Sequence, residues 1–295
     1  MTATVMPLAE RGILSVTGPD SRRFLQGQCT ADAQSLAPGA WVLGGFCTAK
    51  GRLYANFYLL CLDDERFWLV MPHAMVAPTI ERLSKYAAFF KTRLEDQSLH
   101  WHGLATVDAN DAALSSGTAL VEPHRVRMHL GSGQSLEWLD PLPSEAYEAR
   151  LGLLEEQANW LPEAHWQRLE MAAGLVWIEP ATSEQFLPQT ISWDYLGGVS
   201  FSKGCYTGQE VVARLHYKGS SKKALRRLSG LGPLPEPLSR LHDEAEKSVG
   251  EMACSVPTEK GWTGLAVLSL QAVKVSLQDQ PVDLGDWVNP VNEAQ

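Results

Sequence analysis

The stretch F-S-K-G-C-Y-T-G-Q-E-V-V-A-R-L-H-Y-K-G, from Phe201 to Gly219, carries the most information in this 295-residue chain. Its T-G-Q-E segment has the spacing of a capping box, which predicts a helix with Thr207 as N-cap and Glu210 at the third helical position. The apolar positions that follow predict that this helix continues to a C-terminal cap near Gly219. Cys205 therefore lies just before the N-terminus of the predicted helix.

Cys205 is the strongest candidate for a reactive group. A helix N-terminus and a neighbouring lysine, here Lys203, both favour the thiolate over the thiol, whereas the carboxylate of Glu210 opposes them if it comes close. The other four cysteines form no C-x-x-C pair and have no histidine at a zinc-finger spacing, so we expect buried thiols and no metal site.

A strip of positive charge extends from the same segment. Residues 201–227 hold seven basic residues and one acid, a formal charge of +6, whereas the whole chain carries −9 and the remainder therefore −15. Such a strip attracts anions, and a folate glutamate tail or an RNA backbone would both qualify as partners. The alternative is a solvated helix face followed by a linker. A general nucleic-acid coat is excluded by the acidic balance of the chain.

The segments around this stretch predict an α+β fold with antiparallel sheets. Strands are expected at Gly12–Val16, within Trp41–Pro72 and in short runs between residues 95 and 142. Three helices are expected from three- and four-residue apolar spacing: one through Val76, Leu83 and Ala87, one at Pro143–Gln157, and one from Pro162 to Gly174.

Three prolines in Leu231–Leu238 predict an exposed connection before a C-terminal β domain. The expected division is therefore 1–228 and 229–295. Apolar residues make up 45% of the chain and charged residues 20%, which is typical of a folded soluble protein. No apolar run approaches the roughly 20 residues of a membrane span, and no signal peptide is recognisable, so a cytoplasmic location is expected.

Signatures of several enzyme classes are absent from the sequence. It contains no G-x-x-x-x-G-K-[ST], H-E-x-x-H, G-x-S-x-G or G-x-G-x-x-G motif. These absences argue against an NTPase, a zinc protease, an α/β-hydrolase and a Rossmann oxidoreductase.

K-G-C-Y-T-G-Q-E followed by V-V-A-R resembles the signature of the YgfZ family, folate-binding relatives of the glycine-cleavage T-protein, an aminomethyltransferase. Further matching segments occur in the order of the family: V-T-G-P-D-S-R-R-F-L-Q-G-Q (16–28), A-K-G-R (49–52), R-L-E-M-A-A-G (168–174), F-L-P-Q (186–189) and L-G-G-V-S-F (196–201). The resemblance implies two α+β lobes with antiparallel sheets plus a C-terminal β-barrel, arranged as a ring around a central channel where folate binds. It also implies a role in tRNA modification and in the maturation of iron–sulfur proteins.

The resemblance also implies roles for single residues. Trp166 occupies the position of a tryptophan associated with folate, and an indole can stack on a pterin ring, although a helical tryptophan can equally belong to the core. Arg11 stands where a second folate-associated aromatic can occur. The acidic residue that the T-protein uses on its folate substrate has no clear counterpart in this chain.

The leading hypothesis that the resemblance implies is a tetrahydrofolate-binding accessory protein that supports iron–sulfur-dependent tRNA modification. Its expected partners are iron–sulfur tRNA-modifying enzymes or assembly factors. Trp166 would hold the folate, and the functional surface would consist of Lys203, Cys205, Tyr206, Gln209 and Glu210. The rival is a folate-dependent one-carbon transferase of the aminomethyl type. A third interpretation is direct RNA binding through the 201–227 strip.

Overall fold

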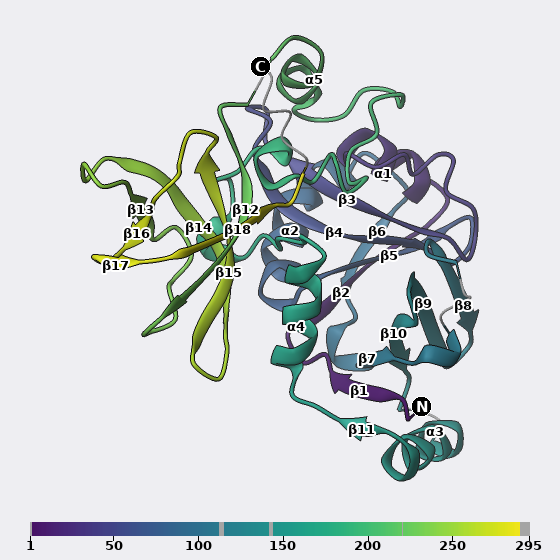
Figure 1. Cartoon of the computed structure of the whole chain (residues 1–295). Helices are drawn as coiled ribbons and strands as arrows, with labels where there is room; N and C mark the ends of the chain where they lie inside the picture. Colours follow the sequence, from purple (N-terminus) through teal and green to yellow (C-terminus); the bar gives the residue numbers. More distant parts are fainter. Residues whose placement is uncertain (1, 112–114, 142–143, 220, 290–295) are drawn as a thin grey trace. The chain divides into compact units, whose positions relative to one another are not determined.

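The computed structural model describes residues 2–111, 115–141, 144–219 and 221–289 (Figure 1). The chain forms two compact units, one from residues 1–44 and 57–166, the other from residues 45–56 and 167–295. The predicted mixed α+β class with antiparallel sheets is confirmed, because three sheets are present and one strand pair is parallel among those described, that of β1 with β11.

The five-stranded sheet has the order β3-β4-β5-β2-β6. Its strands are β2 (Arg11–Thr17), β3 (Trp41–Cys47), β4 (Leu53–Cys61), β5 (Arg66–Pro72) and β6 (Arg93–Asp96). All nine residues of β4 are buried, which explains why its sequence is a nearly continuous apolar run rather than an alternating one. The only polar side chain within that run is the amide of Asn56, apart from the hydroxyls of two tyrosines.

The six-stranded sheet has the order β11-β1-β7-β10-β9-β8. Its strands are β1 (Thr4–Pro7), β7 (His102–Val107), β8 (Thr118–Glu122), β9 (Arg125–Gly131), β10 (Gln134–Leu139) and β11 (Asn159–Trp160). Within this sheet Glu137 is completely buried, and Arg125 and Arg150 contact its carboxylate at 2.5 and 2.8 Å. Burial raises the pKa of Glu137, but hydrogen bonds and charge from Arg150 and Arg125 outweigh it and hold the pKa below its ordinary value.

The seven-stranded sheet has the order β17-β16-β13-β14-β15-β12-β18. Its strands are β12 (Lys223–Leu231), β13 (Arg240–His242), β14 (Ser248–Pro257), β15 (Gly261–Ser269), β16 (Ser276–Leu277), β17 (Gln280–Pro281) and β18 (Asp283–Trp287). It corresponds to the predicted C-terminal barrel, but the strands as described form an open half-barrel that runs from β17 to β18. Its core is built around Trp262, Leu228 and Met252.

Five α-helices occur in the described residues, and the three expected from apolar spacing are among them. The five are α1 (Ser21–Gln28), α2 (His73–Ala87), α3 (Ser144–Gln157), α4 (Glu163–Ala172) and α5 (Gln209–Lys218). Gly174, two residues beyond α4, has a φ of +85°, the left-handed conformation expected of a C-terminal cap. No helix in the described residues is long and apolar enough to cross a membrane. Residues 142–143, which include the predicted start of α3 at Pro143, lie outside the described residues.

The predicted boundary after residue 228 falls inside β12, whose nine residues all pair with β15. Leu231 and Leu234 in the proline-rich segment are 74% and 49% exposed, in agreement with an exposed connection. A separately folding domain at 229–295 stays a prediction.

Candidate functional site

The capping box predicted at Thr207 is not formed. Helix α5 begins at Gln209, its N-cap is Gly208 with φ +87°, and no side chain caps its first turn. A conventional N-cap residue has an extended backbone and offers a side-chain oxygen, and Gly208 has neither. The predicted C-terminal cap at Gly219 is confirmed.

Gly208 is required by a close approach of two chain segments. A Cβ atom on Gly208 would lie 2.4 Å from the carbonyl oxygen of Thr48 and 3.1 Å from the Cα atom of Gly51. Gly51, at φ +73°, lies equally close to α5, because a Cβ atom added to Gly51 would lie 2.9 Å from the Cβ of Val211. The A-K-G-R turn at 49–52 therefore packs directly against the start of α5, with a glycine on each side of the contact.

A third segment, around F-L-P-Q at 186–189, holds both partners of this contact. The guanidinium of Arg52 donates hydrogen bonds to the carbonyl oxygens of Glu184 and Gln185. The side-chain amide of Gln189 donates to the carbonyl oxygen of Val212 in α5 at 2.8 Å. Three segments that are far apart in sequence thus form one scaffold beneath the K-G-C-Y-T-G-Q-E loop.

The loop is also fixed at its other end. The ring of Phe201 stacks on the imidazole of His216 in the last turn of α5, with centroids 3.6 Å apart and an interplanar angle of 13°. The segment from Phe201 to Gly208 therefore begins beside the last turn of α5 and ends at the first turn of the same helix. Both attachments restrict the backbone that carries Cys205.

Cys205 is the exposed cysteine of the five in the chain. Three of the others are buried and Cys254 is half-buried. Burial raises the pKa of the Cys61 thiol, and it raises the pKa of Cys254 to about 12. Gly204, beside Cys205, is also exposed, and a Cβ there would meet no atom within 4 Å. The thiol that the sequence singled out is therefore accessible, with open space next to it.

The other predicted site residues fall into two groups. Lys203 and Tyr206 are 8% and 7% exposed, and the Lys203 ammonium lies 5.3 Å from the centroid of the Tyr206 ring, a cation–π contact. Gln209 is half-buried, and its backbone N–H donates to the carbonyl oxygen of Tyr206. Glu210 is exposed in the first turn of α5, where a carboxylate interacts favourably with the helix dipole. The side chains of Lys203 and Tyr206 are thus buried and pack against each other, whereas Cys205 and Glu210 are exposed to solvent.

Fewer basic residues of the 201–227 strip are available on the surface than its sequence suggests. Arg226 donates to the carbonyl oxygens of Gly285 and Ala272, and Arg227 donates to that of Ala172. Together with the buried Lys203, these are three of its seven basic residues. The exposed ones are Arg214, Lys218, Lys222 and Lys223. The ring of Tyr217, which is 67% exposed, lies on the same helix.

Trp166 lies in α4 and is 1% exposed. Its indole N–H is buried and has no hydrogen-bond partner among the described residues. The burial favours the core alternative for this tryptophan, and the unsatisfied N–H is a group that a ligand oxygen or nitrogen would satisfy. Arg11 is the first residue of β2 and is half-buried.

Asn56 is a polar residue whose structural role the sequence did not reveal. It is fully buried in β4, where its amide donates to the carbonyl oxygen of Val176 and accepts from the N–H of Ile178, both at 2.8 Å. In the sequence, Asn56 was visible only as a single asparagine within an apolar run. Its role could not be predicted because the two backbone groups that it binds are 120 and 122 residues away.

Among the residues that the structure describes, no group of three or more His, Cys, Asp or Glu side chains is arranged to hold a metal ion. Cys205 accordingly belongs to no such group among these residues.

Comparisons with known proteins agree with this architecture. The model of the GCVT N-terminal domain family matches residues 2–108. The chain is 32% identical over 272 residues to the tRNA-modifying protein YgfZ of Shigella sonnei, covering 88% of this chain and 82% of the relative, and the same values hold for YgfZ of Escherichia coli K12. Among solved structures, the glycine cleavage system aminomethyltransferase T from Bartonella henselae superposes with a TM-score of 0.75. That match has 17% identity and covers 96% of this chain and 84% of the other, so it shows a shared fold.

Proposed function

Because the chain belongs to the YgfZ family of tRNA-modifying proteins, we propose that it is a tetrahydrofolate-binding accessory protein that supports iron–sulfur-dependent tRNA modification through the thiol of Cys205. The observation that carries this proposal is the accessible Cys205 on a loop fixed at both ends. A loop whose backbone is held by a glycine contact and an aromatic stack presents its thiol in a defined position, as a functional group requires.

Folate binding is the second part of the proposal and is supported by the aminomethyltransferase fold. Trp166 is the proposed contact, through its buried indole N–H, which has no hydrogen-bond partner among the described residues. The ring-shaped arrangement around a central channel belongs to this proposal as well.

The test of the thiol is Cys205→Ser in a strain that lacks the native gene, with thiolated tRNA nucleosides measured by mass spectrometry. Serine keeps the size of cysteine but does not ionise near neutral pH, so we expect modification to fall towards the level of the deletion strain. Ser202→Ala, an exposed change in the same loop, is the matched control and should restore modification. Full restoration by Cys205→Ser would contradict the proposed role of the thiol.

The folate part is tested separately by calorimetry with tetrahydrofolate. Cys205→Ser should bind it as the unchanged protein does, and Trp166→Leu should bind it more weakly. The transferase alternative predicts turnover of a methylamine-type donor with tetrahydrofolate, and the accessory role predicts none. Unchanged affinity in a folded Trp166→Leu protein would assign Trp166 to the core.

Direct contact with tRNA is a second candidate function, favoured by one feature of α5. Its exposed cations, with Lys222 and Lys223 beyond it, accompany the exposed ring of Tyr217, and such a combination can bind a phosphate backbone and stack on an unpaired base. Lys218→Ala together with Lys222→Ala should reduce the salt dependence of tRNA binding, by about one unit of slope for each lysine–phosphate pair that the substitutions remove. Lys247→Ala with Lys260→Ala, two exposed lysines of the C-terminal sheet region, is the control. Equal effects of both pairs would rule out a specific contact through α5.

A further inference from the structure

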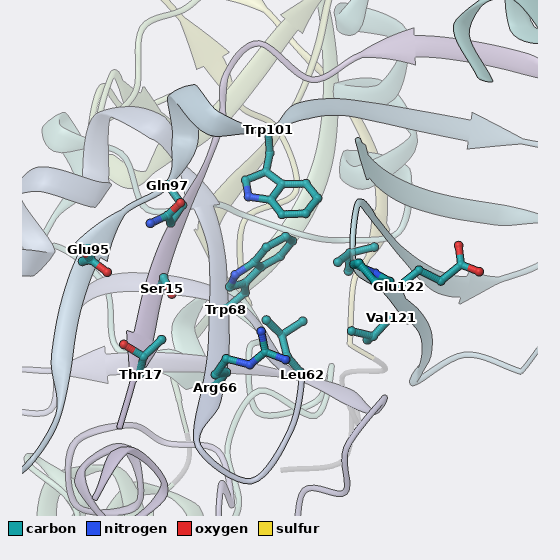
Figure 2. A pocket seen from close by; sticks show the side chains of 12 residues that line it. Ser15, Thr17, Leu62, Arg66, Trp68, Glu95, Gln97, Trp101, Val121 and Glu122 are labelled. Atoms are coloured by element: carbon teal, nitrogen blue, oxygen red, sulfur yellow. The ribbon is translucent and has the colours of Figure 1, made fainter. Parts of the chain in front are cut away.

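A hollow of about 590 Å³ lies within the first compact unit, away from the Cys205 loop in sequence (Figure 2). One side of the hollow is formed by residues of β2, β5 and β6 and of the turns beside these strands. The opposite side is formed by the hairpin of β8 and β9. The volume is within the range of small-molecule sites, roughly 300–1,000 Å³. The size alone is sufficient for a ligand as large as a nucleoside.

One wall of the hollow is aromatic and rigid. The rings of Trp68 and Trp101 meet edge to face, with centroids 4.8 Å apart and planes at 72°. Trp68 also meets Trp138 at 6.2 Å and 82°. Trp68 and Trp138 are 4% and 1% exposed, whereas Trp101 is half-buried. A flat ligand would therefore contact an indole that is already held in place, which lowers the entropy cost of binding.

One edge of the hollow offers hydrogen bonds. Four groups that line it have no hydrogen-bond partner among the described residues: the Ser15 hydroxyl, the Gln97 amide and the indole N–H groups of Trp68 and Trp101. In Figure 2 both indole nitrogens are on the side of Gln97 and Ser15. The indoles can only donate, whereas the amide and hydroxyl can donate and accept. A matching ligand carries several acceptors and at least one donor along the edge of a flat ring.

The charged residues that line the hollow are already paired. Arg66 contacts Asp63 at 2.5 Å, Glu95 contacts Arg93 at 2.8 Å, and Glu122 lies 3.9 Å from Arg125. Arg66 is the one cation in the lining among the described residues, and two carboxylates, Glu95 and Glu122, line the hollow with it. The lining therefore carries a net charge of −1, which disfavours an anionic ligand such as a phosphate or a glutamate tail.

We propose that this hollow binds an uncharged, flat heteroaromatic ring of nucleoside size, either a free nucleoside or a base turned out of an RNA. The aromatic wall provides a stacking contact, and the polar edge recognises the ring nitrogens and oxygens. The inference does not depend on the folate proposal, because folate carries an ionised glutamate tail.

The test is calorimetry of the full-length protein with adenosine, guanosine, cytidine and uridine. We expect at least one nucleoside to bind, and its 5′-monophosphate to bind no more tightly. Stacking on an aromatic side chain contributes about 1–3 kcal/mol per base, so Trp101→Leu should weaken binding by roughly tenfold or more. Gln97→Leu keeps the approximate size but removes the amide, and it should change the preference among the four nucleosides. Trp160→Leu, at a 38% exposed tryptophan of β11 that does not line the hollow, is the control.

Three results would overturn the proposal. These are the absence of binding by all four nucleosides at millimolar concentration, unchanged binding in both Trp101→Leu and Gln97→Leu, and displacement of the bound nucleoside by tetrahydrofolate. Two further results support it and distinguish the source of the ring. Displacement of the nucleoside by unfractionated tRNA would indicate a base in RNA, and persistence of the nucleoside would indicate a free one.

Discussion

Replacement of Gly208 by alanine tests the contact on which the Cys205 loop depends. Alanine in the left-handed conformation costs about 1–2 kcal/mol. The new Cβ would also lie 2.4 Å from the Thr48 carbonyl oxygen, a backbone atom that cannot rotate away, and overpacking of this kind costs about 1–3 kcal/mol. The two penalties together give roughly 2–5 kcal/mol.

Two other glycines of the same unit separate these contributions. Gly197 has φ +86° but open space around its Cβ, so Gly197→Ala should cost only the conformational part. Gly204 has open space and no left-handed backbone, so Gly204→Ala should change stability by no more than about 0.5 kcal/mol. The expected order of destabilisation is therefore Gly208, then Gly197, then Gly204.

Hydrogen exchange of the α5 amides is the direct assay, because it reports local opening as well as global unfolding. A decrease of about 2 kcal/mol in stability corresponds to an increase of roughly 30-fold in the population of the open state. Urea denaturation followed by circular dichroism measures the global effect. If Gly208→Ala and Gly204→Ala gave the same protection of α5, the packing of the A-K-G-R turn against α5 would be refuted.

Three further predictions concern other parts of the chain. Glu137→Gln should lower the free energy of unfolding by roughly 3 kcal/mol at pH 7, because it removes the carboxylate that two arginines contact in a buried position. Since the pKa of Glu137 is lowered in the folded state, its stabilisation is complete above its ordinary pKa and is lost as the pH falls through the lower folded value. Chemical denaturation at a series of pH values should therefore show the difference in stability between the two proteins shrinking in acid. Asn56→Leu leaves a buried carbonyl and a buried N–H at Val176 and Ile178 unpaired and should cost roughly 2–4 kcal/mol in the same assay, and a near-neutral result would contradict the bridging role of Asn56. Iodoacetamide at neutral pH should alkylate Cys205 before the other four cysteines, as peptide mass spectrometry would show, and equal labelling of all five would refute the described exposure.

The sequence predicted most of the elements because their signals are local. Apolar spacing located α2, α3 and α4. The start of α5 was predicted wrongly for a physical reason. The T-G-Q-E pattern is compatible with a capping box, but Gly208 takes a left-handed backbone that brings it against Thr48. That constraint comes from a residue 160 positions earlier, and no local pattern contains it.

The charge of the 201–227 strip also could not be interpreted fully from the local sequence. A count of basic residues gives the net charge, but it does not show which of them are used inside the fold. Arg226 has carbonyl partners in the segments after β15 and within β18, and Arg227 has one at the end of α4. The two arginines of β12 are therefore structural, whereas Lys222 and Lys223 before them are exposed.

The two glycines of the K-G-C-Y-T-G-Q-E segment have different roles, and this difference bears on the thiol. Gly208 is required by backbone shape, because any side chain there would collide with the A-K-G-R turn. Gly204 has no such requirement, and its missing side chain leaves open space beside Cys205. A motif that only shaped the backbone would explain Gly208 and leave both Gly204 and the accessible cysteine unexplained. A motif that presents a thiol to an approaching partner explains all three, since it needs a fixed loop, an exposed sulfur atom and room next to it.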